Sequence, residues 1–151
     1  FCSALGKNIT LVKNGRNPKD FNISQLRLVY LAPTRDEAWN DAQEHAHYMM
    51  QTYDTWLKEA ADAKWFQETM SVSDMPPPEK LRDTPGLSFF EAPLMIGTPD
   101  DIIEEIERYE SSSRVTHLVM WMQLAGMPAD KTERSMKLFA EEVMPHFRKA
   151  N

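Results

Sequence analysis

The sequence predicts an α/β fold with a parallel sheet, on three observations. Residues 115–122 are apolar at nearly every position, as in a strand that helices cover on both faces. Residues 23–32 form a second strand, which alternates at first and becomes wholly apolar at its end. Each strand leads through a loop into a helix, which is the pattern of βα units with parallel strands.

Composition limits the class of protein. A chain of 151 residues that is 42% hydrophobic can form one domain with its own core. A net charge of −6 argues against nucleic acid or an anionic membrane as partner. The lone Cys2 cannot form an internal disulfide, which favours the cytoplasm. No apolar run reaches the ~20 residues of a membrane span.

A long helix is predicted from Thr34 to about Ala63. Thr34 and Glu37 have the spacing of a capping box at its start. An apolar stripe at intervals of three and four then marks one face of the helix. It comprises Trp39, Ala42, Ala46, Met49, Met50, Tyr53, Trp56, Leu57 and Ala60. Ahead of the first strand, residues 1–14 resemble a helix that stops at Gly15.

Residues 64–93 contain five prolines and no sustained helical or strand pattern. A stretch of this length inside a compact domain is typically a lid, a binding loop or a disordered segment. The pair Phe89 and Phe90 suggests that part of it docks on a surface. Residues 93–96 are too few to decide between a third strand and a short lead into the next helix.

Two further helices follow. Thr98 as N-cap and Pro99 at the first helical position predict a helix over 99–110. Its N–H groups could face a phosphate, but acids in the first turn favour an ordinary cap. A final helix is expected over about 130–144, with Asp130 and Glu133 as a cap pair and Pro145 as its end.

The candidate site lies where the strand 115–122 ends. Trp121 and Gln123 stand two residues apart, just before a loop that contains glycine. An aromatic face and an amide suit a flat heteroaromatic ligand or its substrate, although Trp121 could equally pack the end of the sheet. Tyr30, at the end of the first strand, is a weaker candidate for the same pocket.

The histidines do not predict a metal site. His45 and His47 are two apart on a helix and point in different directions. His117 stands at the start of its strand and is expected to be a packing histidine, and His146 is expected to be solvated. The chain also lacks the usual nucleophile and nucleotide-binding motifs.

The chain resembles the luciferase-like monooxygenase family, the flavin-dependent (FMN or F420) barrel enzymes. Four segments carry the resemblance by their order and spacing: residues 26–39, 96–103, 115–120 and 139–146. The resemblance implies the C-terminal part of a (β/α)₈ TIM barrel, about its last two βα units, with residues 1–151 as a single partial domain. Most flavin-binding and catalytic residues would then lie upstream of Phe1.

The resemblance also implies a reaction. The family oxidises small organic substrates with reduced flavin and O₂, and the cofactor carries the chemistry. Residues 33–93 would be a long helical and proline-rich insertion that acts as a lid against water. Trp121, Gln123 and Tyr30 would line the flavin and substrate pocket, and this chain alone is not expected to bind flavin tightly.

Two other interpretations stay open. One is a non-catalytic half-barrel that associates with itself or with another chain, using the apolar stripe between Trp39 and Ala60. The other is a small independent α/β binding protein whose likeness to the family is accidental. An upstream reading frame with further βα units would favour the enzyme over both.

Overall fold

A computed structural model of the chain describes residues 13–15, 17, 22–60, 75–84, 94–112 and 115–148. These residues form three strands, β1 (Ser24–Leu31), β2 (Met95–Gly97) and β3 (His117–Trp121). The helices are α2 (Arg35–Ala60), η2 (Pro78–Asp83), α4 (Pro99–Ser112), α5 (Ala129–Leu138), η3 (Phe139–Val143) and α6 (Met144–Arg148). The predicted α/β class is confirmed.

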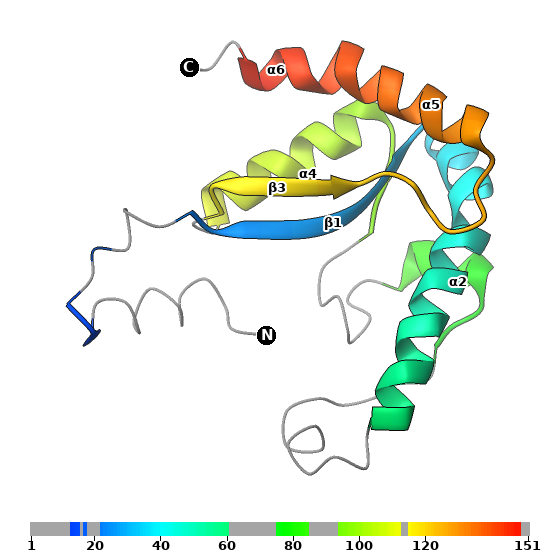
Figure 1. Ribbon diagram of the computed structural model, residues 1–151. Coiled ribbons are helices and arrows are strands. Elements are labelled where there is room, and N and C mark those ends of the chain that lie inside the picture. The colour runs from blue at the N-terminus through cyan, green and yellow to red at the C-terminus, as the bar shows by residue number, and fades with distance from the viewer. Residues whose placement is uncertain are drawn as a thin grey trace.

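The described strands form one parallel sheet in the order β2-β1-β3, with β1 in the middle. Leu28 of β1 pairs with Trp121 of β3, and Tyr30 pairs with Ile96 of β2. The segment before the second helix is therefore a strand, displaced by one or two residues from the predicted 93–96. The parallel registers place the carboxyl ends of all three strands at the same edge of the sheet. Figure 1 shows β1 and β3 side by side and running in the same direction.

Alternation along β1 divides the core in two. Leu28 and Tyr30 point to one face and pack with the first half of α2. Val29 and Leu31 point to the other face, where α4 and the C-terminal helix cover them. In Figure 1, α4 and the α5–α6 helix lie on one side of the strands, while α2 runs away from their carboxyl ends.

The prediction that residues 115–122 are buried on both faces is wrong for the first part of β3. His117 is exposed, and Val119 is 50% exposed beside its partner Leu26, which is 46% exposed. The start of β3 is exposed because of its place in the sheet. Among the described residues β3 pairs only with β1, and α2 covers only the carboxyl end of this face. Trp121, at that end, is partly buried against the α2 cluster.

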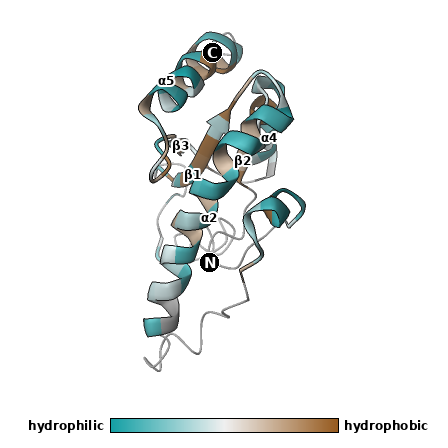
Figure 2. Ribbon diagram, turned by 90° about the vertical axis from the view of Figure 1, so that its right-hand side faces the viewer, coloured by the Kyte–Doolittle hydropathy of each residue, from teal (hydrophilic) through white to brown (hydrophobic). Residues whose placement is uncertain are grey.

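Among the described side chains of α2, the apolar stripe is buried as far as Met50 and more exposed beyond it. Trp39 and Met50 are 8% and 3% exposed, whereas Trp56 is 56% exposed and stacks edge-on with Tyr53 at 5.3 Å between ring centroids. Figure 2 shows the reason, since the second half of α2 projects beyond the sheet. The helix is described to Ala60, and residues 61–63 of the predicted helix lie outside the described part.

One of the two hydrogen bonds of the predicted capping box is found at the start of α2. The Thr34 Oγ1 atom accepts a hydrogen bond from the Glu37 N–H at 3.2 Å. The predicted reciprocal bond from Glu37 is replaced by an ion pair, because the Glu37 carboxylate faces Arg134 at 3.9 Å. The capping box is therefore half right.

The C-terminal helix differs from the prediction at both ends. It starts at Ala129 after Pro128, and Glu133 pairs with Lys137 at 2.9 Å instead of forming a cap with Asp130. Pro145 does not end it, because η3 is a π-helical turn in which the Met144 N–H reaches back to the Phe139 carbonyl. Pro145 then falls in the first turn of α6, where its missing N–H is tolerated.

The predicted insertion over 33–93 is described in part. Contrary to the expectation of no helix after residue 63, Pro78–Asp83 form a 3₁₀ helix with Leu81 3% exposed in the α2 cluster. Arg82 also pairs with Asp36 at 2.7 Å. Residues 61–74 and 85–93, with Phe89 and Phe90, lie outside the described part, as do residues 1–12. Gly15 has a φ of 68°, as expected of a helix stop.

No described helix combines the length and the apolar composition needed to cross a membrane.

Two neighbouring polar residues of α5 test the packing against β1. The buried Leu31 N–H donates to Ser135 Oγ at 2.9 Å, so Ser135→Ala should lower the free energy of unfolding by about 1–3 kcal/mol. The Thr132 hydroxyl is buried and has no hydrogen-bond partner among the described residues. Thr132→Val should therefore raise that free energy by about 1 kcal/mol. Urea unfolding of both variants is the measurement, and an equal loss in both would contradict this packing.

Candidate functional site

The carboxyl edge of the sheet gathers the ends of three strands and the starts of three helices. Strand β1 ends at Leu31, β2 at Gly97 and β3 at Trp121, and α2, α4 and α5 begin just beyond. The Ala32 N–H donates to the Gly97 carbonyl at 3.1 Å, which continues the pairing of β1 and β2 past the strand ends. Parallel α/β sheets place their sites at this edge.

The start of α4 is filled by its own side chains. Asp101 Oδ2 accepts hydrogen bonds from the Thr98 N–H and from Thr98 Oγ1, both at 2.9 Å. A Cβ atom on Gly97 would lie 2.5 Å from that oxygen, which explains the glycine. Arg35 pairs with Asp101 through two bonds and, with Thr98, lowers the pKa of the carboxyl to about 2. An ordinary cap, and not a phosphate, occupies this helix start.

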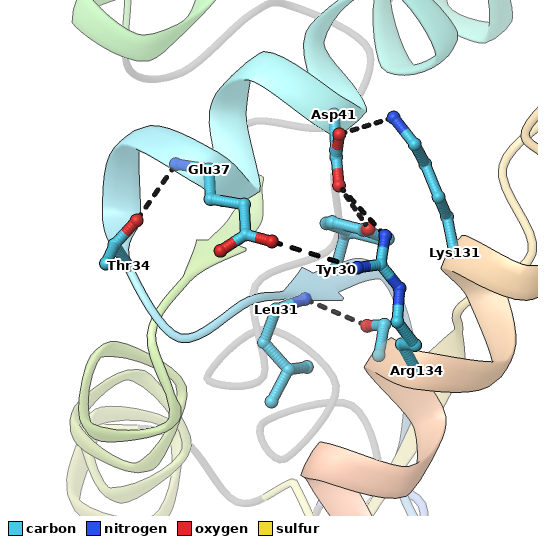
Figure 3. Close-up of polar contacts among 8 residues, drawn as sticks. Tyr30, Leu31, Thr34, Glu37, Asp41, Lys131 and Arg134 are labelled. Atoms are coloured by element: carbon cyan, nitrogen blue, oxygen red, sulfur yellow. Dashed lines mark hydrogen bonds and ion pairs between the residues drawn. The ribbon is translucent and has the colours of Figure 1, made fainter.

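A polar network lies over the end of β1 (Figure 3). The Tyr30 hydroxyl donates to Asp41 Oδ2 at 3.0 Å, and Lys131 forms an ion pair with the other oxygen of Asp41. Arg134 lies 3.8 Å from Asp41 and 3.9 Å from Glu37. Two acids of α2 therefore face two cations of α5 across the strand.

The network changes the acidity of its members. Burial opposes ionisation of Asp41, but hydrogen bonds from Lys131 and Tyr30 outweigh it and lower the pKa of Asp41. Burial and the bond to Asp41 raise the pKa of the Tyr30 phenol, so Tyr30 is a fixed donor at neutral pH. The arrangement links α2 to α5 across the end of β1.

A cavity of ≈150 Å³ adjoins this network. It is lined by Tyr30, Leu31, Ala32, Pro33, Glu37, Arg134 and Leu138. Pockets for drug-sized ligands measure about 300–1,000 Å³. The cavity is too small to hold a flavin ring system by itself.

The three predicted site residues reach different surroundings. Tyr30 is 2% exposed, and Trp121 packs against the same α2 cluster, so the sheet brings these two together. Gln123 lies beyond the end of β3 and is exposed. Its Nε2 donates to the carbonyls of Leu124 and Met127 at 3.2 and 3.4 Å, which supports the loop.

Three histidines make polar contacts. His45 Nδ1 lies 3.0 Å from the Ala125 carbonyl and fastens the β3–α5 loop, whose Gly126 has a φ of 75°. His117 is exposed beside Thr116, so the expected packing role is wrong, and His146 pairs with Glu107 at 2.8 Å. No cluster of three potential metal ligands occurs among the described residues.

Asp41, Lys131 and Arg134 were not predicted from the sequence as site residues. A signal was present, because Glu37 and Asp41 are four apart on one helix and Lys131 and Arg134 are three apart on another. Like charges on one helix face are costly unless another element supplies the opposite charge. Recognising the pairing required knowledge that both helices start at the same sheet edge.

Comparison with known proteins identifies the class. The sequence profile of the luciferase-like monooxygenases matches residues 7–116, more than half of the chain. The chain belongs to this family. No curated protein matches the sequence.

Among solved structures, the crystal structure of monooxygenase RslO1 from Streptomyces bottropensis has a similar fold, with a TM-score of 0.60 and 17% sequence identity. The match covers 95% of this chain and 36% of that one. The chain thus spans about a third of the length of this structural relative. Its parallel three-stranded sheet is consistent with part of a luciferase-like barrel.

The described residues do not by themselves fit a flavin. The cations at the carboxyl edge face Asp41, Glu37 and Asp101, and the start of α4 is filled by Asp101. The cavity at this edge is also small. The Tyr30–Asp41 hydrogen bond and the partly buried Trp121 ring lie at this edge beside α2.

Asp41→Asn tests this network. The variant keeps an oxygen for Tyr30 but loses the charge that faces Lys131 and Arg134, so the free energy of unfolding should fall by about 1–3 kcal/mol at pH 7. The folded-state pKa of Asp41 is lowered, so its contribution is complete above the unfolded-state pKa of about 4 and is lost as pH falls further.

Urea unfolding from pH 7 downward measures the difference between the variant and the parent chain. The difference should shrink below pH ~4. Asp36→Asn is the control, because the Asp36 side chain is 79% exposed and should matter little. Equal effects of the two substitutions would contradict a specific role for Asp41.

Proposed function

We propose that this chain forms part of the barrel of a flavin-dependent luciferase-like monooxygenase, which oxidises a small organic substrate with reduced flavin and O₂. The observation that carries the proposal is the common carboxyl edge of β1, β2 and β3, where three helices begin. Barrel enzymes place their chemistry at this edge. Family membership gives the reaction class.

The three predicted residues take distinct roles in the proposal. The partly buried Trp121 ring presents an apolar wall to the ligand pocket. Gln123 reaches the ligand through its amide oxygen, since its nitrogen is bonded to the loop. Tyr30 positions the end of β1 through Asp41 and lies beneath the pocket.

The flavin, FMN or F420, supplies the oxygen chemistry when it is bound. We propose that residues outside the described part of the chain, or outside the chain itself, hold most of it. The Pro33–Pro93 insertion is proposed to shield the pocket, with η2 fixing its middle against α2 through the buried Leu81. The lone cysteine supports the cytoplasm as location, and the net charge supports a partner other than nucleic acid.

A second candidate is a non-catalytic half-barrel that associates with itself or another chain. The specific observation is the paired exposure of Leu26 and Val119 on the face of the sheet that α2 leaves uncovered. In this candidate, a second polypeptide would cover these two neighbouring apolar side chains. The two candidates differ in whether the native protein carries flavin.

Flavin binding tests the proposal in two steps. We expect that titration of FMN or F420 into the 151-residue chain will show no quenching of flavin fluorescence at sub-micromolar concentration, because the edge cavity is small and its cations are paired. We expect that the native polypeptide, captured from its source with an antibody against residues 131–151, will release flavin on denaturation.

Each step has a contradicting outcome. Sub-micromolar quenching by the isolated chain would show that it contains a flavin site of its own. A captured polypeptide without flavin, which also fails to bind added FMN and F420, would contradict the monooxygenase. It would support the half-barrel if its native mass were a multiple of its chain mass.

A further inference from the structure

A second cavity lies away from the carboxyl edge, at the amino end of β3. It measures ≈350 Å³ and lies between α4 and α6. Its floor is formed by Leu118 and Met120, and its walls by Ile106, Tyr109, Phe139 and Phe147. The volume falls within the range of small-molecule sites, about 300–1,000 Å³.

The lining is apolar but incompletely covered. Leu118, Met120, Phe139 and Phe147 pack on the second core cluster, yet each remains partly accessible to water. Hydrated apolar surface in a concave site is costly, and an apolar ligand would remove it from water. Three aromatic rings around one cavity also favour an aromatic ligand, through edge and face contacts.

The charged groups around the cavity favour neither an anionic nor a cationic ligand. Glu110 and Arg148, of opposite charge, both line it. Arg27 donates to the Tyr109 hydroxyl at 2.6 Å and lies 4.8 Å from the centre of that ring. Arg108 also lies 5.3 Å from the centre of that ring, but it is paired with Glu105. The C-terminal ends of α4 and α6, which carry partial negative charge, lie at the same end as the start of β3 (Figure 1) and oppose the charge of Arg27. An uncharged ligand fits this balance.

The polar backbone at the mouth is already paired. The N–H groups of Thr116 and His117 both donate to the Ile23 carbonyl, at 2.9 and 3.2 Å. The Thr116 hydroxyl accepts from the Ile23 N–H at 2.8 Å and contacts His117 Nδ1 at 2.9 Å. A polypeptide segment would bring N–H and C=O groups that need partners, whereas an apolar small molecule would not.

From these observations we propose that the cavity between α4 and α6 is a binding site for a small, uncharged aromatic molecule. The site is separate from the carboxyl edge and from the proposed oxidation, and it does not depend on flavin. Its ligand is recognised by shape and apolar contact, with the rings of Tyr109, Phe139 and Phe147 as the principal contacts.

The test uses N-phenyl-1-naphthylamine, an uncharged fluorescent aromatic probe, with the full 151-residue chain. We expect saturable binding at one site, with Kd on the order of micromolar to 100 micromolar. Methyl NMR of the methionines locates the probe, because Met120 and Met144 line the cavity while Met50 and Met127 lie in the other core cluster. The first two signals should shift and the last two should stay.

A matched pair of variants provides the control. Val115 lines the cavity, whereas Val119 is 50% exposed on the opposite face of the sheet. Val115→Trp should fill the mouth and weaken probe binding about tenfold or more, while Val119→Trp should change it less than about twofold. Both variants are checked for an unchanged thermal unfolding midpoint. If Val115→Trp does not fold, Phe139→Leu replaces it, with weaker binding expected.

Several outcomes overturn the proposal. They are absence of saturable binding, equal weakening by the two tryptophan variants, or shifts confined to Met50 and Met127. Tighter binding of the anionic 8-anilinonaphthalene-1-sulfonate would contradict an uncharged ligand. A Met120 methyl that contacts residues outside the described ranges, with no probe bound, would show that polypeptide fills the cavity.

Discussion

The fold of the described residues depends on the burial of the second half of β1 between α2 on one face and α4 with the C-terminal helix on the other. Residues 28–31 are each at most 4% exposed, and they alternate between the α2 cluster and the cluster under α4. Because β1 also pairs with both β2 and β3, its register determines where the carboxyl ends of all three strands lie. A shift of β1 by one residue would exchange Tyr30 and Leu31 between layers and lose both core clusters.

This constraint explains the polar network at the carboxyl edge. Once Tyr30 is fixed on the α2 side, its hydroxyl needs an acceptor, and Asp41 on the second turn of α2 provides it. The Asp41 carboxylate in turn needs cations, which α5 supplies from Lys131 and Arg134. The same strand end supplies the Leu31 N–H to Ser135. The network therefore positions α2 and α5. Its two cations, Lys131 and Arg134, already face Asp41 and are not free to bind a phosphate.

The fold was predictable from local pattern where the pattern had one meaning. The strand before Pro33, the Thr34 and Thr98 caps and the helix after Pro99 follow from residue type and spacing, and all are found. The exposed start of β3 was not predictable, because burial depends on which neighbours a strand has and not on its own composition. Pro145 was wrongly predicted to end the C-terminal helix. The π-helical turn over Phe139–Val143 places Pro145 in the first turn of α6, where a proline is tolerated.

The candidate site was predictable only in location. The ends of the strands indicated the correct edge and the residues Tyr30 and Trp121, which share one cluster. Asp41, Lys131 and Arg134 were not predicted because their roles depend on a contact between α2 and α5. Asp41 and Lys131, which form an ion pair there, are 90 residues apart in the sequence. Gln123 was paired with Trp121 by the period of a strand, but β3 ends at Trp121 and the period does not continue into the loop.

Hydrogen exchange on the native polypeptide that contains this chain would show whether the carboxyl edge forms a wall of the flavin and substrate site, as we propose. Exchange would be compared with and without bound flavin. The account predicts slower exchange at residues 30–34 and 121–127 when flavin binds. Unchanged exchange there, with protection confined to the amino end of β3 at residues 115–118, would contradict it.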